Sequence, residues 1–187
     1  MDWIFILRSL YFFLPAYFAN MAPSVAKRFR LAEFLAKPID IGKQYKGSPF
    51  FGSHKTWRGI ILGTIAGILV VWIQKILYEF PFFRYISFYN YQEVNIMFLG
   101  FLIGFGALLG DLFFSFLKRR KNIKPGASWV PFDQIGYILG PFLLVNLFFK
   151  SQRIDIYAWL WILIFSFFLH MIGNRVGFWL KVSDSKI

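Results

Sequence analysis

The chain has 187 residues, of which 58% are hydrophobic and 22% aromatic, and its formal net charge is +12 at pH 7. It contains no cysteine, which excludes a disulfide, a thiolate nucleophile and a cysteine metal site within this sequence. Several uncharged apolar runs are long enough to cross a bilayer of roughly 30 Å, so the composition indicates an integral membrane protein. In such a protein the basic excess favours anionic head groups or phosphates as partners, and we expect no nucleic acid.

The apolar runs predict an all-α fold with about five transmembrane helices in one polytopic domain, residues 1–187. We expect the first run to be retained, because no basic n-region or clear cleavage site accompanies it. Arg8 within it is expected to snorkel or to face other helices. The expected spans lie at about 3–19, 59–77, 94–117, 134–149 and 156–171, the last continuing as helix to about 180.

The connecting segments differ in character. A polar, basic loop from 23 to 57 is expected to hold a short interfacial helix at about 24–37. An aromatic interfacial segment is expected from 78 to 93. Gly59, Gly63 and Gly67 recur every fourth residue in the second span, and the third carries glycines at 100, 104, 106 and 110. We interpret both sets as faces for close helix packing rather than as phosphate loops.

The distribution of Lys and Arg predicts the topology. Sixteen of these residues fall on one side: eight between the first two spans, five after the third and three in the tail. Only four fall on the other side, namely Lys75, Arg84, Lys150 and Arg153. By the positive-inside rule both basic loops and the C-terminus are cytoplasmic, and the N-terminus is outside. We therefore expect a protein of the cell's inner (cytoplasmic) membrane, with its candidate site facing the cytoplasm.

The stretch from Gly110 to Gln134 carries most of the candidate chemistry. Asp111 follows seventeen uncharged residues, and a carboxylate there costs roughly 2.5–3.5 kcal/mol on insertion scales, which marks a functional-site candidate. On a continuous helix Asp111, Ser115 and Lys118 share one face. A short basic loop is expected next, and Asp133 begins the following span. The loop's cations are Lys118, Arg119, Arg120, Lys121 and Lys124.

Two acids that flank one basic loop suit a divalent metal carrying a polyphosphate. The alternative is that the loop is only a topology signal and that Asp111 simply pairs with Lys118. A second candidate lies at the start of the second span, where Lys55, Thr56 and Arg58 surround a helix N-terminus that favours an anion. Its alternative is that Lys55 and Arg58 merely anchor the span.

Three stretches, in order, resemble the CDP-archaeol synthase family, which is related to the phosphatidate cytidylyltransferases. Asn20-Met21-Ala22-Pro23 is similar to its N-terminal motif, and His54-Lys55-Thr56-Trp57-Arg58-Gly59 is similar to its G-K-T-x-R-G stretch. The run from Gly110 through Lys124-Pro125-Gly126 to Asp133-Gln134 resembles its signature. Together they cover most of the chain. The chain departs from the pattern at Gly136, where the family usually has an acid.

The resemblance implies that CTP and a lipid phosphate give a CDP-activated lipid and pyrophosphate, with Mg²⁺ and a cytoplasmic site. It implies Asp111, Asp133 and Lys118 as catalytic residues, and the two acids as metal ligands. Lys118, Arg119 and Lys124 are expected to hold the pyrophosphate portion, and Lys55, Thr56 and Arg58 the other phosphate. The motifs further imply substrate contacts from Asn20, Ser115, Arg120, Gly126 and Gln134. The lipid tails are expected between glycine-lined helices.

The residues leave other functions open. The acceptor can be an archaeal-type ether lipid phosphate, phosphatidate or an unusual glycerol phosphate lipid. A non-catalytic binding or scaffold protein of the same fold is an alternative that Gly136 favours. A small transporter with Asp111 as an ion site is a third, disfavoured by the absence of an inverted repeat.

Overall fold

The computed structural model describes residues 3–45, 47–124, 127, 129–150 and 153–179. Its long helices are α1 (Trp3–Arg28), α2 (Trp57–Leu77), α4 (Ile96–Arg120), α5 (Phe132–Phe148) and α6 (Ile156–Trp179). A short helix, α3 (Pro81–Tyr85), lies in the expected aromatic segment. The basic loop holds a 3-10 turn, Glu33–Leu35, and a small antiparallel hairpin of β1 (Gln44–Tyr45) and β2 (Ser48–Pro49). The predicted all-α class is confirmed.

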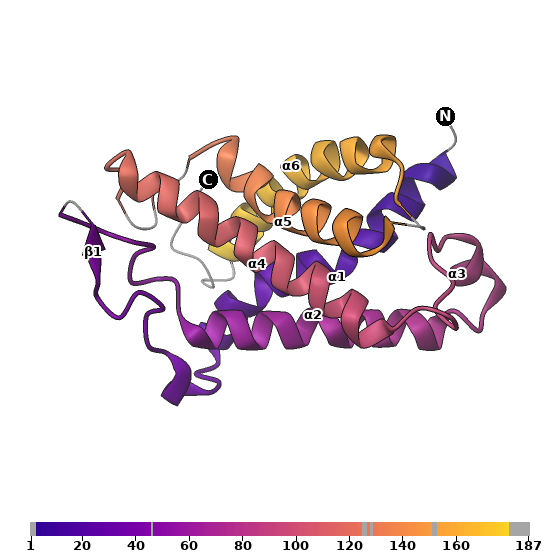
Figure 1. The fold of residues 1–187 in the computed structure, drawn as a ribbon, viewed down its shortest axis with the longest axis horizontal. Helices are drawn as coiled ribbons and strands as arrows, with labels where there is room; N and C mark the ends of the chain where they lie inside the picture. Colours follow the sequence, from indigo (N-terminus) through magenta and orange to yellow (C-terminus); the bar gives the residue numbers. More distant parts are fainter. Residues whose placement is uncertain (1–2, 46, 125–126, 128, 151–152, 180–187) are drawn as a thin grey trace.

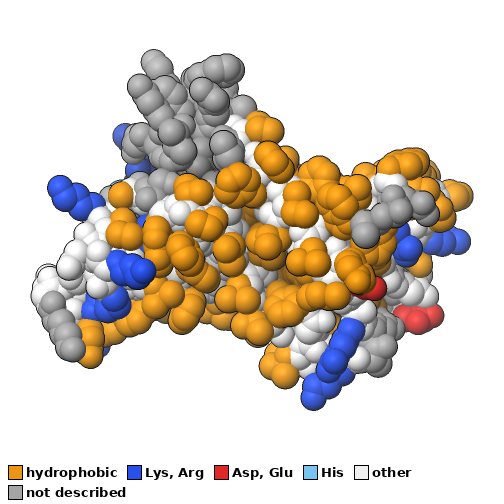
Figure 2. Space-filling model, turned by 90° about the horizontal axis from the view of Figure 1, so that it is seen from above, with side chains coloured by type: hydrophobic (Ala, Val, Ile, Leu, Met, Phe, Trp, Pro, Cys, Tyr) orange, Lys and Arg blue, Asp and Glu red, His pale blue; other side chains and the backbone are white. Residues whose placement is uncertain are grey.

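The helices run back and forth between two ends of the molecule, with the β1 hairpin at one end and α3 at the other (Figure 1). Among the described residues α1, α2 and α4 are long and apolar enough to cross a membrane, whereas α5 and the stretch Ile156–Leu169 of α6 are shorter apolar helices. A belt of hydrophobic side chains covers the middle of one face, and Lys and Arg side chains gather toward its ends (Figure 2). This pattern is that of a protein embedded in lipid.

The first helix is longer than expected. It continues to Arg28 instead of ending near residue 19, and no separate interfacial helix occupies 24–37. Pro23 lies inside α1, and its ring nitrogen cannot donate to the carbonyl of Ala19. A Cβ at Gly63 would lie only 2.7 Å from that carbonyl oxygen, so α2 packs closely where α1 lacks this hydrogen bond. The chain leaves the helical path beyond Arg28, where Arg30 and Ala32 have φ of 53° and 47°.

The third long helix also extends further than expected. Lys118, Arg119 and Arg120 form the last turn of α4 rather than a loop. Cations are stabilised there by the negative end of the helix dipole. The helix ends at Arg120, and Asn122 follows with a φ of 56°, the left-handed conformation that asparagine tolerates after a helix. The amide of Ile123 then returns to the carbonyl of Lys118 at 3.1 Å.

The predicted glycine faces are confirmed as packing surfaces. A Cβ at Gly67 would lie 2.7 Å from the Cα of Gly104, so α2 and α4 touch at the backbone. A Cβ at Gly140 would lie 1.8 Å from the carbonyl oxygen of Gly106, so α4 and α5 touch as well. Because these faces are filled by backbone, the expectation that lipid tails lie between them is wrong.

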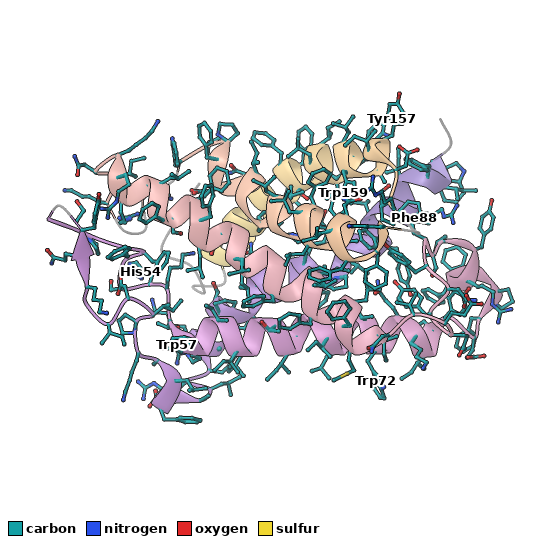
Figure 3. All side chains as sticks on the ribbon, viewed as in Figure 1. His54, Trp57, Trp72, Phe88, Tyr157 and Trp159 are labelled. Carbon is teal, nitrogen blue, oxygen red and sulfur yellow. The ribbon has the colours of Figure 1, made fainter. Side chains whose placement is uncertain are left out.

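Aromatic side chains form the core at the α3 end. Phe12 packs edge-on against Trp159 of α6, with ring centroids 5.6 Å apart, and both side chains are buried. Arg8, expected to snorkel or to face other helices, instead contacts the connection between α3 and α4, donating to the carbonyl of Ser87 at 2.8 Å and lying 5.0 Å from the centre of the Phe88 ring. Trp159 and Phe88 lie well away from His54 and Trp57, which are at the hairpin end (Figure 3). The candidate site is therefore remote from this core.

Candidate active site

Asp111 lies on α4, and its partner is Lys55, which precedes α2. The ammonium of Lys55 donates to Oδ2 of Asp111, and both side chains are 28% exposed. The alternative that Asp111 pairs with Lys118 is wrong. The two residues are 56 positions apart in sequence, and the contact joins the family-like Lys-Thr-x-Arg stretch to the acid that precedes the second basic region.

Lys118 pairs instead with Asp133 at the start of α5. Its ammonium contacts both carboxylate oxygens, at 3.0 and 2.9 Å, and also the carbonyl of Ala127. The backbone amide of Trp129 donates to Asp133 at 2.8 Å. The pair is more enclosed than the first, because Lys118 is 10% exposed and Asp133 is 23% exposed at the side chain.

The two ion pairs are related by the geometry of α4. Asp111 and Lys118 are seven residues apart, which on an α-helix means about 10 Å along the axis and nearly the same face. Ser115 lies on that face between them and is buried. The structure thus gathers two carboxylates and two ammonium groups from three separate stretches of the chain along one side of α4.

The start of α2 is built around Thr56 and Arg58. Thr56 is the N-cap, and its hydroxyl accepts the amide of Gly59 at 3.2 Å, which satisfies one of the free donors of the helix end. Arg58 is 9% exposed and donates to the carbonyl of Leu31 at 3.4 Å. Both side chains therefore have structural partners at the positions where phosphate contacts were predicted.

Arg119 and Arg120 differ in what they contact. Arg119 is 5% exposed and donates to the carbonyl of Lys124 at 3.2 Å, while its Nε has no hydrogen-bond partner among the described residues. Arg120 donates to the carbonyls of Tyr45, Ser48 and Pro49 at 2.7, 3.1 and 2.7 Å. The guanidinium of Arg120 thus holds the hairpin against α4.

The remaining predicted residues are more scattered. Asn20 is half-buried in α1, and Lys124 is exposed after α4. Gln134 is buried, and its Oε1 has no hydrogen-bond partner among the described residues. Gly126 lies outside the described residues. Gly136, the position at which the sequence departs from the pattern it resembles, packs against Phe114. A Cβ built at Gly136 would lie 3.1 Å from a ring carbon of that side chain.

One residue near the site was missed from the sequence. Asp40 is 8% exposed and accepts three backbone N–H groups of the loop that carries Lys55. A weak signal was present, because an aspartate two residues before a glycine is typical of a turn in which the side chain accepts the later amide.

A magnesium ion shared with a substrate would take Asp111 and Asp133 as its carboxylate ligands. Among the described residues no group of three or more His, Cys, Asp or Glu side chains lies together, so protein ligands alone do not complete a metal site there. Mg²⁺ commonly binds one or two carboxylates and fills its other positions with water and substrate phosphates. Among the described residues, Asp111 contacts one lysine, whereas Asp133 accepts from two donors, the ammonium of Lys118 and the amide of Trp129, so Asp111 is the more available of the two predicted ligands.

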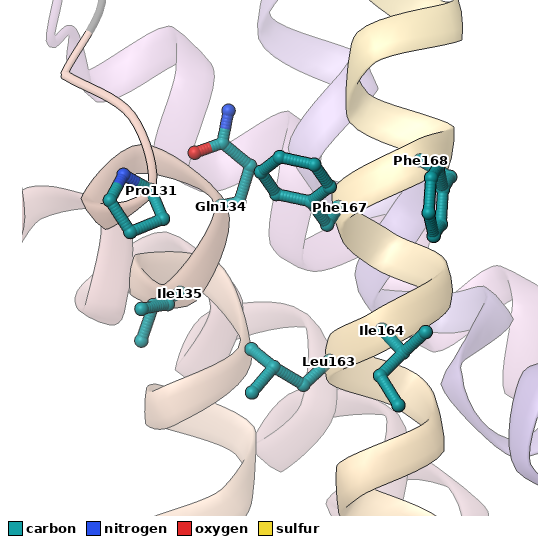
Figure 4. A pocket seen from close by; sticks show the side chains of 7 residues that line it. All are labelled: Pro131, Gln134, Ile135, Leu163, Ile164, Phe167 and Phe168. Atoms are coloured by element: carbon teal, nitrogen blue, oxygen red, sulfur yellow. The ribbon is translucent and has the colours of Figure 1, made fainter.

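An apolar cleft of about 300 Å³ opens between the start of α5 and α6. Pro131, Gln134 and Ile135 form one wall, and Leu163, Ile164, Phe167 and Phe168 form the other (Figure 4). Gln134 follows Asp133 directly, so the cleft begins next to the second ion pair.

Comparisons with known proteins place this chain in a family. Residues 2–186 match the family model described as CarS-like, CDP-archaeol synthase. The chain is 38% identical to a CDP-archaeol synthase of Pyrococcus furiosus over 136 residues, 72% of this chain and 71% of that protein. It is 32% identical to one of Methanocaldococcus jannaschii over 182 residues, 96% of each. A solved structure of an intramembrane enzyme for archaeal membrane lipids biosynthesis shares the fold, with a TM-score of 0.72, 24% identity, and coverage of 90% of this chain and 94% of that one.

Proposed function

Because this chain belongs to the CDP-archaeol synthase family, we propose that it transfers CMP from CTP to a lipid phosphate, giving a CDP-activated lipid and pyrophosphate. The observation that carries the proposal is the convergence of Lys55, Asp111, Lys118 and Asp133 into two ion pairs along α4. These residues belong to the motifs through which the chain resembles the family. By the names of its relatives, an archaeal-type ether lipid phosphate is the first candidate acceptor.

The reaction joins two anions, and their repulsion is the main obstacle. An oxygen of the lipid phosphate attacks the α-phosphorus of CTP, the bond to the β-phosphate oxygen breaks, and pyrophosphate leaves. No covalent protein intermediate is needed. Lys55 and Lys118 supply positive charge at fixed places, held there by Asp111 and Asp133, so that little reorganisation is needed when the phosphates arrive.

Magnesium is part of the proposal. Bound by Asp111, with Asp133 as the second carboxylate, it would neutralise phosphate charge. The lysine contacts have a role in this arrangement, because they balance the charge of the half-buried acids when no divalent ion is present. Arg119 is the residue best suited to receive a phosphate oxygen, since its buried guanidinium has an Nε without a partner among the described residues.

The lipid chains belong in the cleft between α5 and α6. Its walls are almost wholly apolar, and several of its α6 side chains, such as Ile164 and Phe168, are exposed where lipid would surround them. A lipid lying there would present its phosphate toward Asp133. The glycine faces of α2, α4 and α5 offer no comparable space.

The test is CTP-dependent release of pyrophosphate by the detergent-purified chain, with ether-linked and ester-linked lipid phosphates as acceptors. We expect a CDP-lipid product and the highest kcat/KM with an ether-linked acceptor. A folded protein that binds these lipids and forms no CDP-lipid would support the scaffold alternative and overturn the proposal.

Lys55→Ala and Arg58→Ala refine the same assay. Both should lower kcat/KM for CTP by about 10-fold or more, since hydrogen bonds to charged groups are worth roughly 1.5–3 kcal/mol. Lys75→Ala, at the opposite end of α2, is the matched control and should retain parental turnover. If the Lys55 and Arg58 variants retain parental turnover, neither residue binds phosphate, and both serve only as membrane anchors.

A further inference from the structure

Asp40 is a buried acid in the loop before α2, and three backbone amides surround it. The amide of Gly42 donates to Oδ1 at 3.3 Å, and the amides of Phe51 and Gly52 donate to Oδ2 at 3.1 Å each. Burial alone would raise the pKa of the Asp40 carboxyl, but these amide hydrogen bonds outweigh it and hold the pKa below its ordinary value. Asp40 is therefore a carboxylate at any neutral assay pH.

The amides that donate to Asp40 belong to turns that contain residues with positive φ. Ile41 has a φ of 48°, which a β-branched residue rarely adopts, and Gly42 and Gly52 have φ of 74° and 97°. Such backbone conformations persist when surrounding contacts enforce them. The Asp40 carboxylate, which accepts hydrogen bonds from both turns, is such a contact.

Asp40 is linked to Lys55 by a closed set of hydrogen bonds. Gly52 donates its amide to Asp40, and its carbonyl accepts the amide of Lys55 at 3.1 Å. The carbonyl of Lys55 in turn accepts the amide of Ile39, the residue before Asp40, at 2.9 Å. The backbone of Lys55 is therefore bonded on both sides to the segment that Asp40 organises.

The outer part of the same loop is attached to α4. Arg120 holds the carbonyls of the hairpin, and the Phe50 ring stacks on Phe116 with centroids 6.0 Å apart. The loop is thus fixed to the helix that carries Asp111, and Asp40 determines how the remainder of the loop, ending in Lys55, is directed toward that acid.

We propose that Asp40 is a positioning residue for the reaction, which through Gly52 holds the backbone of Lys55 so that its ammonium meets Asp111 and the substrate phosphate. It contacts no substrate itself. This inference rests on the proposed function for its kinetic consequence, although its structural consequence can be measured without any turnover.

The structural test uses the absence of cysteine in the chain. A nitroxide spin label on Ser53→Cys, an exposed position between Gly52 and Lys55, reports the mobility of this segment by electron paramagnetic resonance. We expect Asp40→Ala to make the label markedly more mobile. Asp40→Asn should give an intermediate spectrum, because its amide nitrogen replaces one acceptor with a donor. Glu33→Ala, which removes an exposed acid of the same loop, is the matched control and should leave the spectrum unchanged.

The kinetic test distinguishes positioning from general stability. Asp40→Ala should lower kcat/KM for CTP by about 10- to 100-fold, the size of effect expected when a charged group is misplaced. In a Lys55→Ala background the same change should cost no more than roughly twofold, because Asp40 acts through Lys55. The thermal midpoint of each variant, measured in the same detergent, identifies any variant that has not folded, and Asp40→Asn provides the milder substitution.

The outcomes separate cleanly. An unchanged label spectrum in Asp40→Ala overturns the positioning role, and so does a full additional loss of activity in the Lys55→Ala background. A parent protein without CTP-dependent turnover overturns the proposed function instead, while the label spectra still decide whether Asp40 orders the segment.

Discussion

At the scale of single residues, the two acids of the site have different surroundings. Asp111 contacts one lysine and is partly open, whereas Asp133 holds Lys118 with both oxygens and also accepts the amide of Trp129. Asp133 therefore has a structural part in joining α4 to α5 in addition to its predicted metal role. Asp111 lacks such a part, because its lysine comes from a loop that other contacts already hold.

This difference leads to a prediction for Asp→Asn variants, which keep the size of the side chain and remove its charge. Both Asp111→Asn and Asp133→Asn should lose most CDP-lipid formation, and the double variant should lose little more, since the acids act as one unit. Asp133→Asn should also lower the free energy of unfolding by about 1–3 kcal/mol, because Lys118 remains enclosed beside a weaker partner.

The measurements are product formation against Mg²⁺ concentration and thermal unfolding in detergent. Glu33→Gln, an exposed acid away from the site, serves as the control for both. If Asp133→Asn retains parental turnover and parental Mg²⁺ dependence, the shared metal site is wrong and Asp133 is a structural residue only.

At the scale of helices, α4 and α5 are joined through glycines whose tolerance of a side chain differs sharply. A Cβ at Gly140 would lie 1.8 Å from a backbone oxygen of α4, which cannot move unless the helices separate. The three atoms nearest to a Cβ at Gly136 would all belong to the Phe114 side chain, at 3.1 to 3.3 Å. Both glycines lie on α5 one turn apart, so they form a matched pair.

Gly140→Ala should destabilise the protein by about 1–3 kcal/mol or more, because it overpacks a contact between two backbones. Gly136→Ala should be nearly neutral, since the gain in helix propensity of roughly 0.5–1 kcal/mol offsets a small shift of Phe114. Thermal midpoints in one detergent provide the measurement. Equal losses in the two variants would contradict the packing described for Gly140.

At the scale of the whole molecule, charge and apolar surface are arranged along one axis. The β1 hairpin, the ends of α1 and α4 and the start of α2 lie at one end with most of the basic residues, and α3 lies at the other (Figure 1). The excess of sixteen Lys and Arg against four predicts that the hairpin end is cytoplasmic. The candidate site, including Lys55 and Asp111, is at this end, which the prediction assigns to the side of the membrane where CTP is available.

Single cysteines test this topology in intact cells. Gln44→Cys and Asn122→Cys, both exposed at the hairpin end, should resist a membrane-impermeant thiol reagent until the cells are permeabilised. Glu93→Cys, exposed between α3 and α4, should react without permeabilisation. Labelling of Gln44→Cys and Asn122→Cys in intact cells, with protection of Glu93→Cys, would reverse the orientation.

The sequence by itself determined the membrane class, the approximate helices and the glycine faces, because apolar run length and residue spacing act locally along the chain. It also singled out Asp111 through the cost of a carboxylate in apolar surroundings, and Asp133 through its place beside the basic loop, both in agreement with the family resemblance. The predicted ends of the first and third spans, near residues 19 and 117, fall short of the observed ends of α1 and α4 at Arg28 and Arg120. A local pattern assigned these polar turns to loops, and helix ends are the part of an element that such a pattern defines least well.

Only the tertiary structure decided which charges meet. Lys55 pairs with Asp111 across 56 residues, and Lys118 pairs with Asp133 rather than with Asp111, which lies two turns away on the same face of α4. Asp40 was missed for the same reason, because two of the amides that donate to its carboxylate lie 11 and 12 residues further along the chain. Ion pairs and hydrogen bonds act over a few ångströms, so their partners are set by how closely α2, α4 and α5 approach, and that approach depends on glycine contacts between helices far apart in the chain.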